Sequence, residues 1–204
     1  MLKSLPPATR AILVANVVMY LLLALLGPQA PAIYLLELWP IATPPFEPWQ
    51  VLTYAFLHAN FMHLFFNMFA VYMFGSALEQ FWGPRRYLVY YFASVLAAGL
   101  TQLTVTALAG IQYPTLGASG GVFGLLLAFA FYFPRQRVTL LFPPIPMPAW
   151  LFVTVYGALE LVLGVTGTQE GVAHFAHLGG MLGGALVILV WRVIEANRRP
   201  PYLR

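Results

Sequence analysis

The sequence contains no cysteine and no aspartate, and charged residues make up only 8% of it. Without cysteine, the protein has no disulfide and no thiolate nucleophile. Without aspartate, it has no Asp to complete a Ser-His-Asp triad. Soluble domains carry a charge on roughly a quarter of their residues. The scarcity of charge therefore excludes an ordinary soluble domain.

Hydrophobic residues make up 61% of the 204 positions, which is typical of an integral membrane protein. A helix crosses the apolar core of a bilayer with about 20 apolar residues. We therefore expect an all-α membrane protein that forms one bundle, a single domain over residues 1–204. Six transmembrane helices are predicted, at residues 11–27, 60–80, 87–109, 119–133, 148–165 and 174–194.

The segment between the first two spans, residues 29–49, is apolar but contains five prolines. Proline inside a helix removes a hydrogen bond and clashes with the preceding turn. This segment is therefore predicted to be a long interfacial loop, with Trp39 and Trp49 at the depth of the headgroups. Residues 1–30 also permit a second interpretation as a cleaved signal peptide, because a basic start precedes an apolar run.

The ten basic residues lie at alternate ends of the six predicted spans. By the positive-inside rule, this places both termini in the cytoplasm, in agreement with an even number of spans. The residues are Lys3, Arg10, Arg85, Arg86, Arg135, Arg137, Arg192, Arg198, Arg199 and Arg204. The net charge of +4 thus reflects topology, and we expect no nucleic-acid partner. The expected location is the cell membrane, plasma or inner.

In this topology, the second, fourth and sixth spans run inward from the outer face, so their first turns share one depth. Ser119 begins the fourth span and His177 lies in the first turn of the sixth. His63 and Asn67, four residues apart in the second span, share one helix face. Ionisable groups inside a bilayer are costly and usually functional. We therefore expect a nucleophile and its general base in the outer part of the membrane.

Glycine residues follow both of these candidates. Gly120 and Gly124, like Gly180 and Gly184, form small-xxx-small pairs, which allow helix backbones to approach closely. The fourth and sixth spans are therefore predicted to pack tightly. A short serine side chain needs such an approach to reach an imidazole.

Taken together, the sequence resembles the rhomboid family of intramembrane serine proteases over nearly its whole length. The resemblance is carried by Gly-Ala-Ser-Gly at 117–120, Ala-His-Leu-Gly-Gly at 176–180 and His-Leu-Phe-Phe-Asn at 63–67. Gly184 and the Glu79 that precedes Gly83 also match. The chain looks like the minimal six-span form of that family.

The resemblance implies that Ser119 is the nucleophile and His177 the general base, a dyad without a third acid. It implies an oxyanion site made of the backbone N–H of Ser119 and the side chains of His63 and Asn67, which are suitable donors. Phe123 is implied to pack on the catalytic imidazole. The implied substrates are single-span membrane proteins within the lipid, cut near the outer face of their helix, and no cofactor is implied.

Four further polar residues call for an interpretation. His58 and His174 are expected to be structural or to face water. Glu160 lies in the fifth span, where a carboxylate needs a cavity or a partner. We expect it to have a hydrogen-bonded structural role, with a part in substrate gating as the alternative. Glu79 is expected to contact the Arg85-Arg86 pair on the cytoplasmic side.

Two other classes of function stay open, and so does a structural interpretation of the serine. A metal-dependent membrane protease or transporter would use His63, His174 and His177 as ligands, but the sequence has no HExxH motif and no aspartate. A non-catalytic rhomboid-like protein would bind membrane clients without cutting them. Ser119 could also simply cap a helix, since serine is favoured there.

Overall fold

The computed structural model describes residues 5–139, 144–167 and 173–198, and most of these residues are helical. Its elements are α1 (Pro7–Leu26), α2 (Pro31–Leu36), α3 (Gln50–Thr53), the 3₁₀ turn η2 (Tyr54–Phe56), α4 (Phe61–Ala70), the π-helical turn η3 (Val71–Gly75), α5 (Ser76–Trp82), α6 (Pro84–Ala109), α7 (Ser119–Tyr132), β1 (Arg137–Thr139), β2 (Pro146–Pro148), α8 (Ala149–Thr166) and α9 (His174–Arg198).

Among the described residues, five helices are long and apolar enough to cross a membrane, and α7 is a shorter apolar helix. The five are α1, the continuous helix formed by α4, η3 and α5, and then α6, α8 and α9. All six predicted spans therefore form helices, which confirms the all-α membrane fold. The predicted boundaries differ from those observed by at most four residues, the largest differences being at Pro7 and Arg198.

Helix α7 is the innermost helix of the bundle. Ten of its 14 residues are buried. At about 1.5 Å per residue it is roughly 21 Å long, shorter than the roughly 30 Å apolar core of a bilayer. A helix this short, enclosed by its neighbours, can begin beneath the level at which the surrounding helices end.

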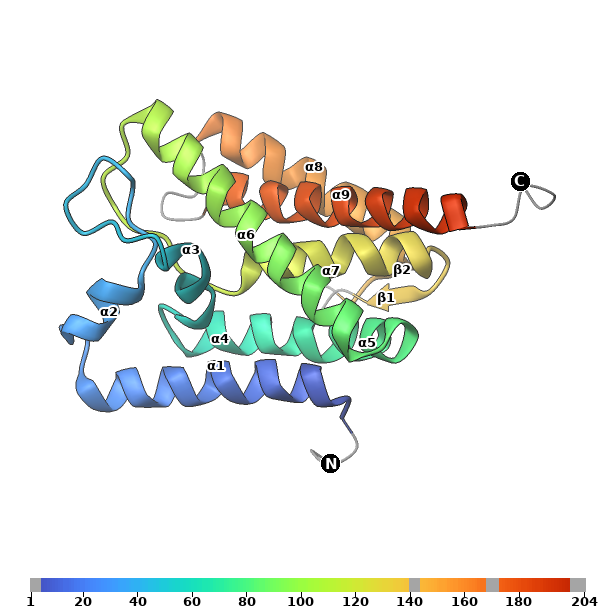
Figure 1. Cartoon of the computed structure of the whole chain (residues 1–204), viewed down its shortest axis with the longest axis horizontal. Helices are drawn as coiled ribbons and strands as arrows, with labels where there is room; N and C mark the ends of the chain where they lie inside the picture. The colour runs from blue at the N-terminus through green and yellow to red at the C-terminus, as the bar shows by residue number, and fades with distance from the viewer. Residues whose placement is uncertain (1–4, 140–143, 168–172, 199–204) are drawn as a thin grey trace.

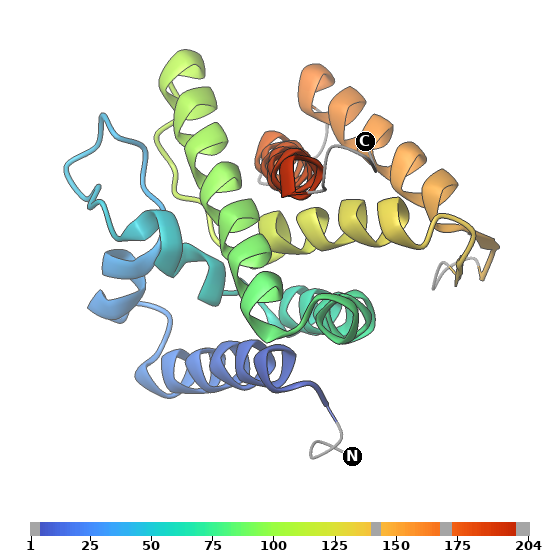
Figure 2. The same ribbon diagram turned by 45° about the vertical axis from the view of Figure 1, so that its right-hand side comes forward.

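Helix α9 packs against α6, α7 and α8. Figure 2 looks almost along the axis of α9 and shows it among these three helices. The contact between α7 and α9 is made by glycines, because a Cβ atom on Gly180 would overlap the carbonyl group of Gly120. A Cβ on Gly124 would overlap Ser94 of α6, and one on Gly184 would overlap the hydroxyl of Tyr90. These glycines therefore allow α6, α7 and α9 to approach closely.

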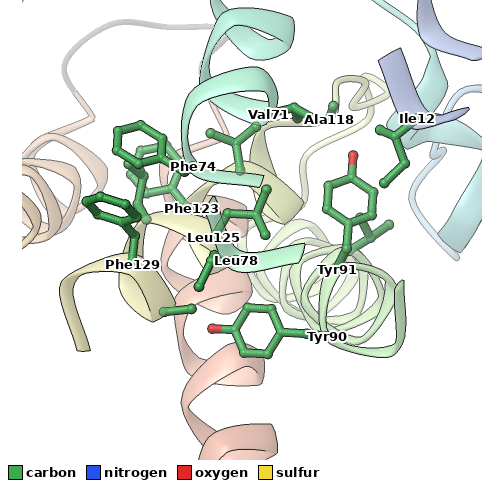
Figure 3. Packing of buried hydrophobic residues seen from close by; sticks show 14 of the residues in the cluster. Ile12, Val71, Phe74, Leu78, Tyr90, Tyr91, Ala118, Phe123, Leu125 and Phe129 are labelled. Atoms are coloured by element: carbon green, nitrogen blue, oxygen red, sulfur yellow. The ribbon is translucent and has the colours of Figure 1, made fainter. Parts of the chain in front are cut away.

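The core is built around tyrosines of α6 and aliphatic residues of α5 and α7. Tyr90 and Tyr91 are fully buried, as are Leu78 and Leu125 (Figure 3). The hydroxyl of Tyr90 donates a hydrogen bond to the carbonyl oxygen of Gly124, at 2.8 Å. A buried tyrosine needs a partner for its hydroxyl, and this bond ties α6 to α7.

Glu79 does not form the predicted contact with Arg85 or Arg86. Its buried carboxylate accepts hydrogen bonds from the backbone N–H groups of Ala8 and Thr9, at 2.9 and 2.6 Å, and from the Thr9 hydroxyl at 2.7 Å. These N–H groups belong to the first turn of α1, which lacks intrahelical partners and attracts negative charge. The carboxylate thus caps α1 and holds it to the bundle, while Arg86 pairs with Glu195 of α9 at 2.9 Å.

The start of α1 and the end of α9 lie at the same end of the bundle, on the right in Figure 1. The α5–α6 junction and the β1–β2 hairpin lie there too. The hairpin was not predicted, and its two strands pair antiparallel, with Val138 opposite Met147. The same-end placement agrees with an even number of spans.

The predicted first loop contains one short helix, α2, and is organised around Gln50, the residue that follows the loop. The Gln50 side chain is fully buried, accepts from the N–H of Trp39 at 3.1 Å and donates to the carbonyl of Pro45 at 2.9 Å. A backbone pair between Leu38 and Thr115 joins this loop to the segment that precedes α7. The first loop therefore supports the chain just before Ser119.

Candidate active site

Ser119 is the first residue of α7, and the turn before it depends on Gly117. The φ angle of Gly117 is +128°, a conformation that side-chain-bearing residues rarely adopt. A Cβ there would also lie 2.8 Å from atoms of the His63 ring. The Gly117 N–H donates to the carbonyl of Tyr54 at 2.9 Å, which fixes the turn against η2. The result is a serine at a helix start with an imidazole beside it.

Ser119 and His177 are 58 positions apart in sequence but form a direct contact. The distance from Ser119 Oγ to His177 Nε2 is 2.8 Å. The ring of Phe123, one turn along α7 from the serine, stacks on the imidazole with centroids 4.3 Å apart and planes 6° from parallel. Stacking of this kind restricts rotation of the imidazole and keeps Nε2 directed at the serine.

Glu160 of α8 lies on the far side of the same imidazole. Its Oε2 is 2.9 Å from His177 Nδ1 and 2.7 Å from His174 Nδ1. No acid was expected behind the imidazole, because the chain has no aspartate. The structure instead places the carboxylate of a glutamate beside Nδ1. The sequence did contain a sign of this contact, because a carboxylate inside an apolar span requires a partner.

His174 and His58 are both buried, so neither faces water. His174 packs edge-on to His177, with ring centroids 6.4 Å apart. His58 lies edge-on to His63 at 5.0 Å. Burial, together with the electrostatic effect of the neighbouring His63 imidazole, lowers the pKa of His58 to about 4. His58 is thus neutral at physiological pH and packs behind His63.

His63 lies against Gly117, two residues before the serine, and Asn67 lines the same cavity as Ser119. The Ala59 N–H donates to His63 Nδ1 at 3.5 Å, so the neutral ring carries its proton on Nε2, the atom that faces Gly117. The Asn67 Nδ2 group donates to the His63 carbonyl at 2.9 Å, and the amide has a second N–H available for another acceptor. Two side-chain donors are therefore present close to Ser119.

A cavity of about 420 Å³ opens beside Ser119. It is lined mainly by apolar side chains from α4, η3, α7, α8 and β1, among them Phe123, Val138 and Tyr156. Asn67 and Ser119 contribute polar groups to its wall. An apolar cavity with a few convergent polar groups is the usual form of a ligand site.

A metal ion was the alternative considered for the histidines. His63, however, is not part of the cluster that has metal-binding geometry. Within the described residues, the groups that could share one ion are Glu160, His174 and His177, whose donor atoms all lie within 4.8 Å of one another. In the structure, both imidazoles lie at hydrogen-bond distance from the same oxygen of the carboxylate.

Comparison with known proteins identifies the family. The sequence profile of the rhomboid domain matches residues 45–193. The chain is 34% identical over 144 residues to Rhomboid protein 1, mitochondrial, of Saccharomyces cerevisiae, a match that covers 70% of this chain and 41% of that protein. It is 30% identical over 138 residues to Rhomboid protease GluP of Bacillus subtilis, covering 68% and 25%. It is 29% identical over 117 residues to Rhomboid protease GlpG of Salmonella choleraesuis, covering 54% and 42%.

The fold and the site thus define a multi-pass membrane protein with a serine–histidine pair inside its helical bundle. The chain belongs to the rhomboid family, as the match over most of its length shows. It spans less than half the length of the three relatives described above.

Proposed function

We propose that this protein is an intramembrane serine endopeptidase that cleaves single-span membrane proteins. The observation that carries the proposal is the 2.8 Å contact between Ser119 Oγ and His177 Nε2. A serine hydroxyl is a weak nucleophile until an adjacent base accepts its proton. The names of two relatives, both called rhomboid proteases, support the same class of activity.

In the proposed reaction, Ser119 Oγ attacks the carbonyl carbon of the scissile bond while its proton moves to His177 Nε2. The carbonyl oxygen becomes an oxyanion, which the Ser119 backbone N–H and the side chains of His63 and Asn67 stabilise. The imidazolium then donates its proton to the leaving nitrogen as the C–N bond breaks. Water, deprotonated by His177, hydrolyses the acyl-enzyme and restores Ser119.

The apolar cavity supports a membrane-embedded substrate. Its lining of aromatic and aliphatic side chains suits a residue from a transmembrane segment, and Ser119 forms part of its wall. In the proposed topology, both termini are cytoplasmic and the protein resides in the cell membrane, in contact with lipid. The non-catalytic alternative, a client-binding protein, does not require Ser119 and His177 to be in contact.

The first prediction concerns where the substrate is cut. If α7 reaches the inner boundary of the apolar core, its roughly 21 Å length leaves Ser119 roughly 10 Å below the outer boundary. We expect cleavage at a small residue near the outer end of the substrate span. Replacing a substrate residue next to the cleavage site with Gly or Pro should increase the rate of cleavage, because both residues weaken the substrate helix.

The test is mass spectrometry of the products after reconstitution of protein and substrate in liposomes. The matched control is the same substrate with leucine at the position of the added Gly or Pro. A cut at the cytoplasmic end of the span would contradict the proposed topology. A rate that does not depend on helix-weakening residues would contradict local unwinding of the substrate.

The second prediction concerns the oxyanion donors. His63→Ala and Asn67→Ala should each lower kcat, by about 10²–10³-fold as for one oxyanion donor in a known case, with little change in KM. Asn16→Ala is a matched control, because the Asn16 amide also donates to the carbonyl four residues earlier, Ile12, but does so in α1. If both site variants melt at lower temperature with kcat intact, His63 and Asn67 are structural.

A further inference from the structure

The part of the site that the serine–histidine chemistry leaves unexplained is Glu160. It lies within the apolar helix α8, and only 7% of the residue is exposed. Its Oε2 atom is within hydrogen-bond distance of two imidazole nitrogens, Nδ1 of His174 and Nδ1 of His177. A buried carboxylate is costly unless it is paired and hydrogen-bonded. Both partners come from the first turn of α9, where they are three residues apart and share a helix face.

The shared oxygen determines which nitrogens carry protons. An ionised carboxylate accepts hydrogen bonds and donates none. Nδ1 of His177 must therefore carry a proton, and in the neutral ring Nε2 is then unprotonated. Nε2 is the atom 2.8 Å from Ser119 Oγ. Glu160 thus selects the tautomer in which His177 can accept the serine proton.

We propose that Glu160 is a positioning residue for His177, and that His174 holds Glu160 in place. Phe123 restrains the imidazole from one face, and Glu160 restrains it through Nδ1. His174 donates to the same oxygen at 2.7 Å, which restricts rotation of the Glu160 side chain. Together these contacts specify the tautomer and the orientation of the base. This inference rests on the proposed serine endopeptidase function.

During attack, the proton leaves Ser119 Oγ for His177 Nε2, and the imidazole becomes positively charged. The Glu160 carboxylate then faces a cation across the 2.9 Å contact and stabilises it, while the proton on Nδ1 stays on the ring. The imidazolium later passes the Nε2 proton to the leaving amine. The carboxylate gains no proton, so its charge is the same before and after each turnover.

The experiment compares three variants of the purified full chain in liposomes with a single-span substrate. Glu160→Gln keeps the size and a carbonyl acceptor but removes the charge. We expect kcat to fall about tenfold with KM unchanged, since charge-assisted hydrogen bonds are roughly twice as strong as neutral ones. Glu160→Leu also removes the acceptor, and kcat should fall by about 10²-fold or more. Glu195→Gln makes the same chemical change at the Arg86 ion pair and should leave kcat unchanged.

A spectroscopic measurement separates positioning from a merely structural role. The sequence has four histidines, so ¹⁵N labelling of histidine gives few signals, and that of His177 is assigned by its loss in His177→Ala. In the wild type we expect a protonated Nδ1 and an unprotonated Nε2. In Glu160→Leu we expect a mixture of tautomers. Wild-type His177 with its proton on Nε2 would overturn the inference, even if every variant were too unstable for kinetics.

The kinetic outcomes are also distinct. If the wild type cleaves in a Ser119-dependent manner and Glu160→Gln and Glu160→Leu keep full kcat, this inference fails while the proposed function stands. If the wild type shows no Ser119-dependent cleavage, the proposed function itself fails. Inhibition by EDTA that zinc reverses would mean that Glu160 is a metal ligand, which would overturn its role as a positioning residue.

Discussion

Ser119→Ala is expected to lower kcat by about 10⁴-fold or more and to leave the protein folded, because it removes the nucleophile and nothing else. His177→Ala should have a similar effect, since the hydroxyl then has no base at 2.8 Å. The two losses should not add in the double variant, because the residues act as a unit. The measurement is the rate of substrate cleavage in liposomes, with folding checked by thermal denaturation.

Ser76→Ala is the matched control for this loss. Ser76 lies in the continuous helix formed by α4, η3 and α5, is partly buried, and is distant in sequence from the motif around Ser119. Its replacement should leave cleavage unchanged. Cleavage retained by a clean Ser119→Ala preparation would show that another group performs the chemistry.

The second large effect, a loss of stability and of cleavage rate, is expected when Gly180→Ala adds one methyl group at the contact between α7 and α9. Gly180→Ala would drive a Cβ into the carbonyl group of Gly120, and backbone atoms cannot move aside as a side chain can. Overpacking typically costs about 1–3 kcal/mol. Gly180 is three residues from His177, and Gly120 follows Ser119, so forcing the helices apart separates the reacting pair. A misplacement of about 1 Å can reduce the rate by about 10²-fold.

Gly157→Ala in α8 makes the same change where there is room for it. Its Cβ would lie 3.3 Å from the terminal methyl of Met181, which is flexible. Alanine also favours the helix by about 1 kcal/mol over glycine, so stability should be unchanged or higher. Thermal denaturation and cleavage rates of both variants test this. Equal behaviour of Gly180→Ala and Gly157→Ala would show that close packing does not hold the pair in place.

The transmembrane helices could be predicted from the sequence because their hydropathy and the charges between them are strong, local signals. The internal order of the first loop and the β1–β2 hairpin were beyond that kind of prediction. The proline-rich loop obtains its order from a buried side chain, Gln50, whose partners are backbone groups up to 15 positions away. Nothing in the local pattern of apolar residues specifies such partners.

In the site, too, local motifs could be read from the sequence, whereas contacts between residues far apart in the chain could not. The motifs around Ser119 and His177 pointed to a nucleophile and a base, and the structure brings these two residues into contact. The partner predicted for Glu79 was wrong, and no partner was predicted for Glu160 beyond its being hydrogen-bonded. Whether Glu79 reaches an arginine or the start of α1, and whether Glu160 reaches His177, depends on how each helix is rotated about its axis. Hydropathy leaves that rotation unspecified in helices that are apolar all round.

The most direct test of Ser119 as the nucleophile is covalent labelling of the folded protein with a fluorophosphonate, followed by mass spectrometric mapping of the modified residue. Ser119 is one of four serines in the chain, and it alone contacts a histidine base among the described residues. A phosphonylated Ser119 with the other serines unmodified, and no labelling in His177→Ala, is the predicted result. Labelling at another serine, or an unmodified Ser119 in protein that cleaves substrate, would contradict the proposed mechanism.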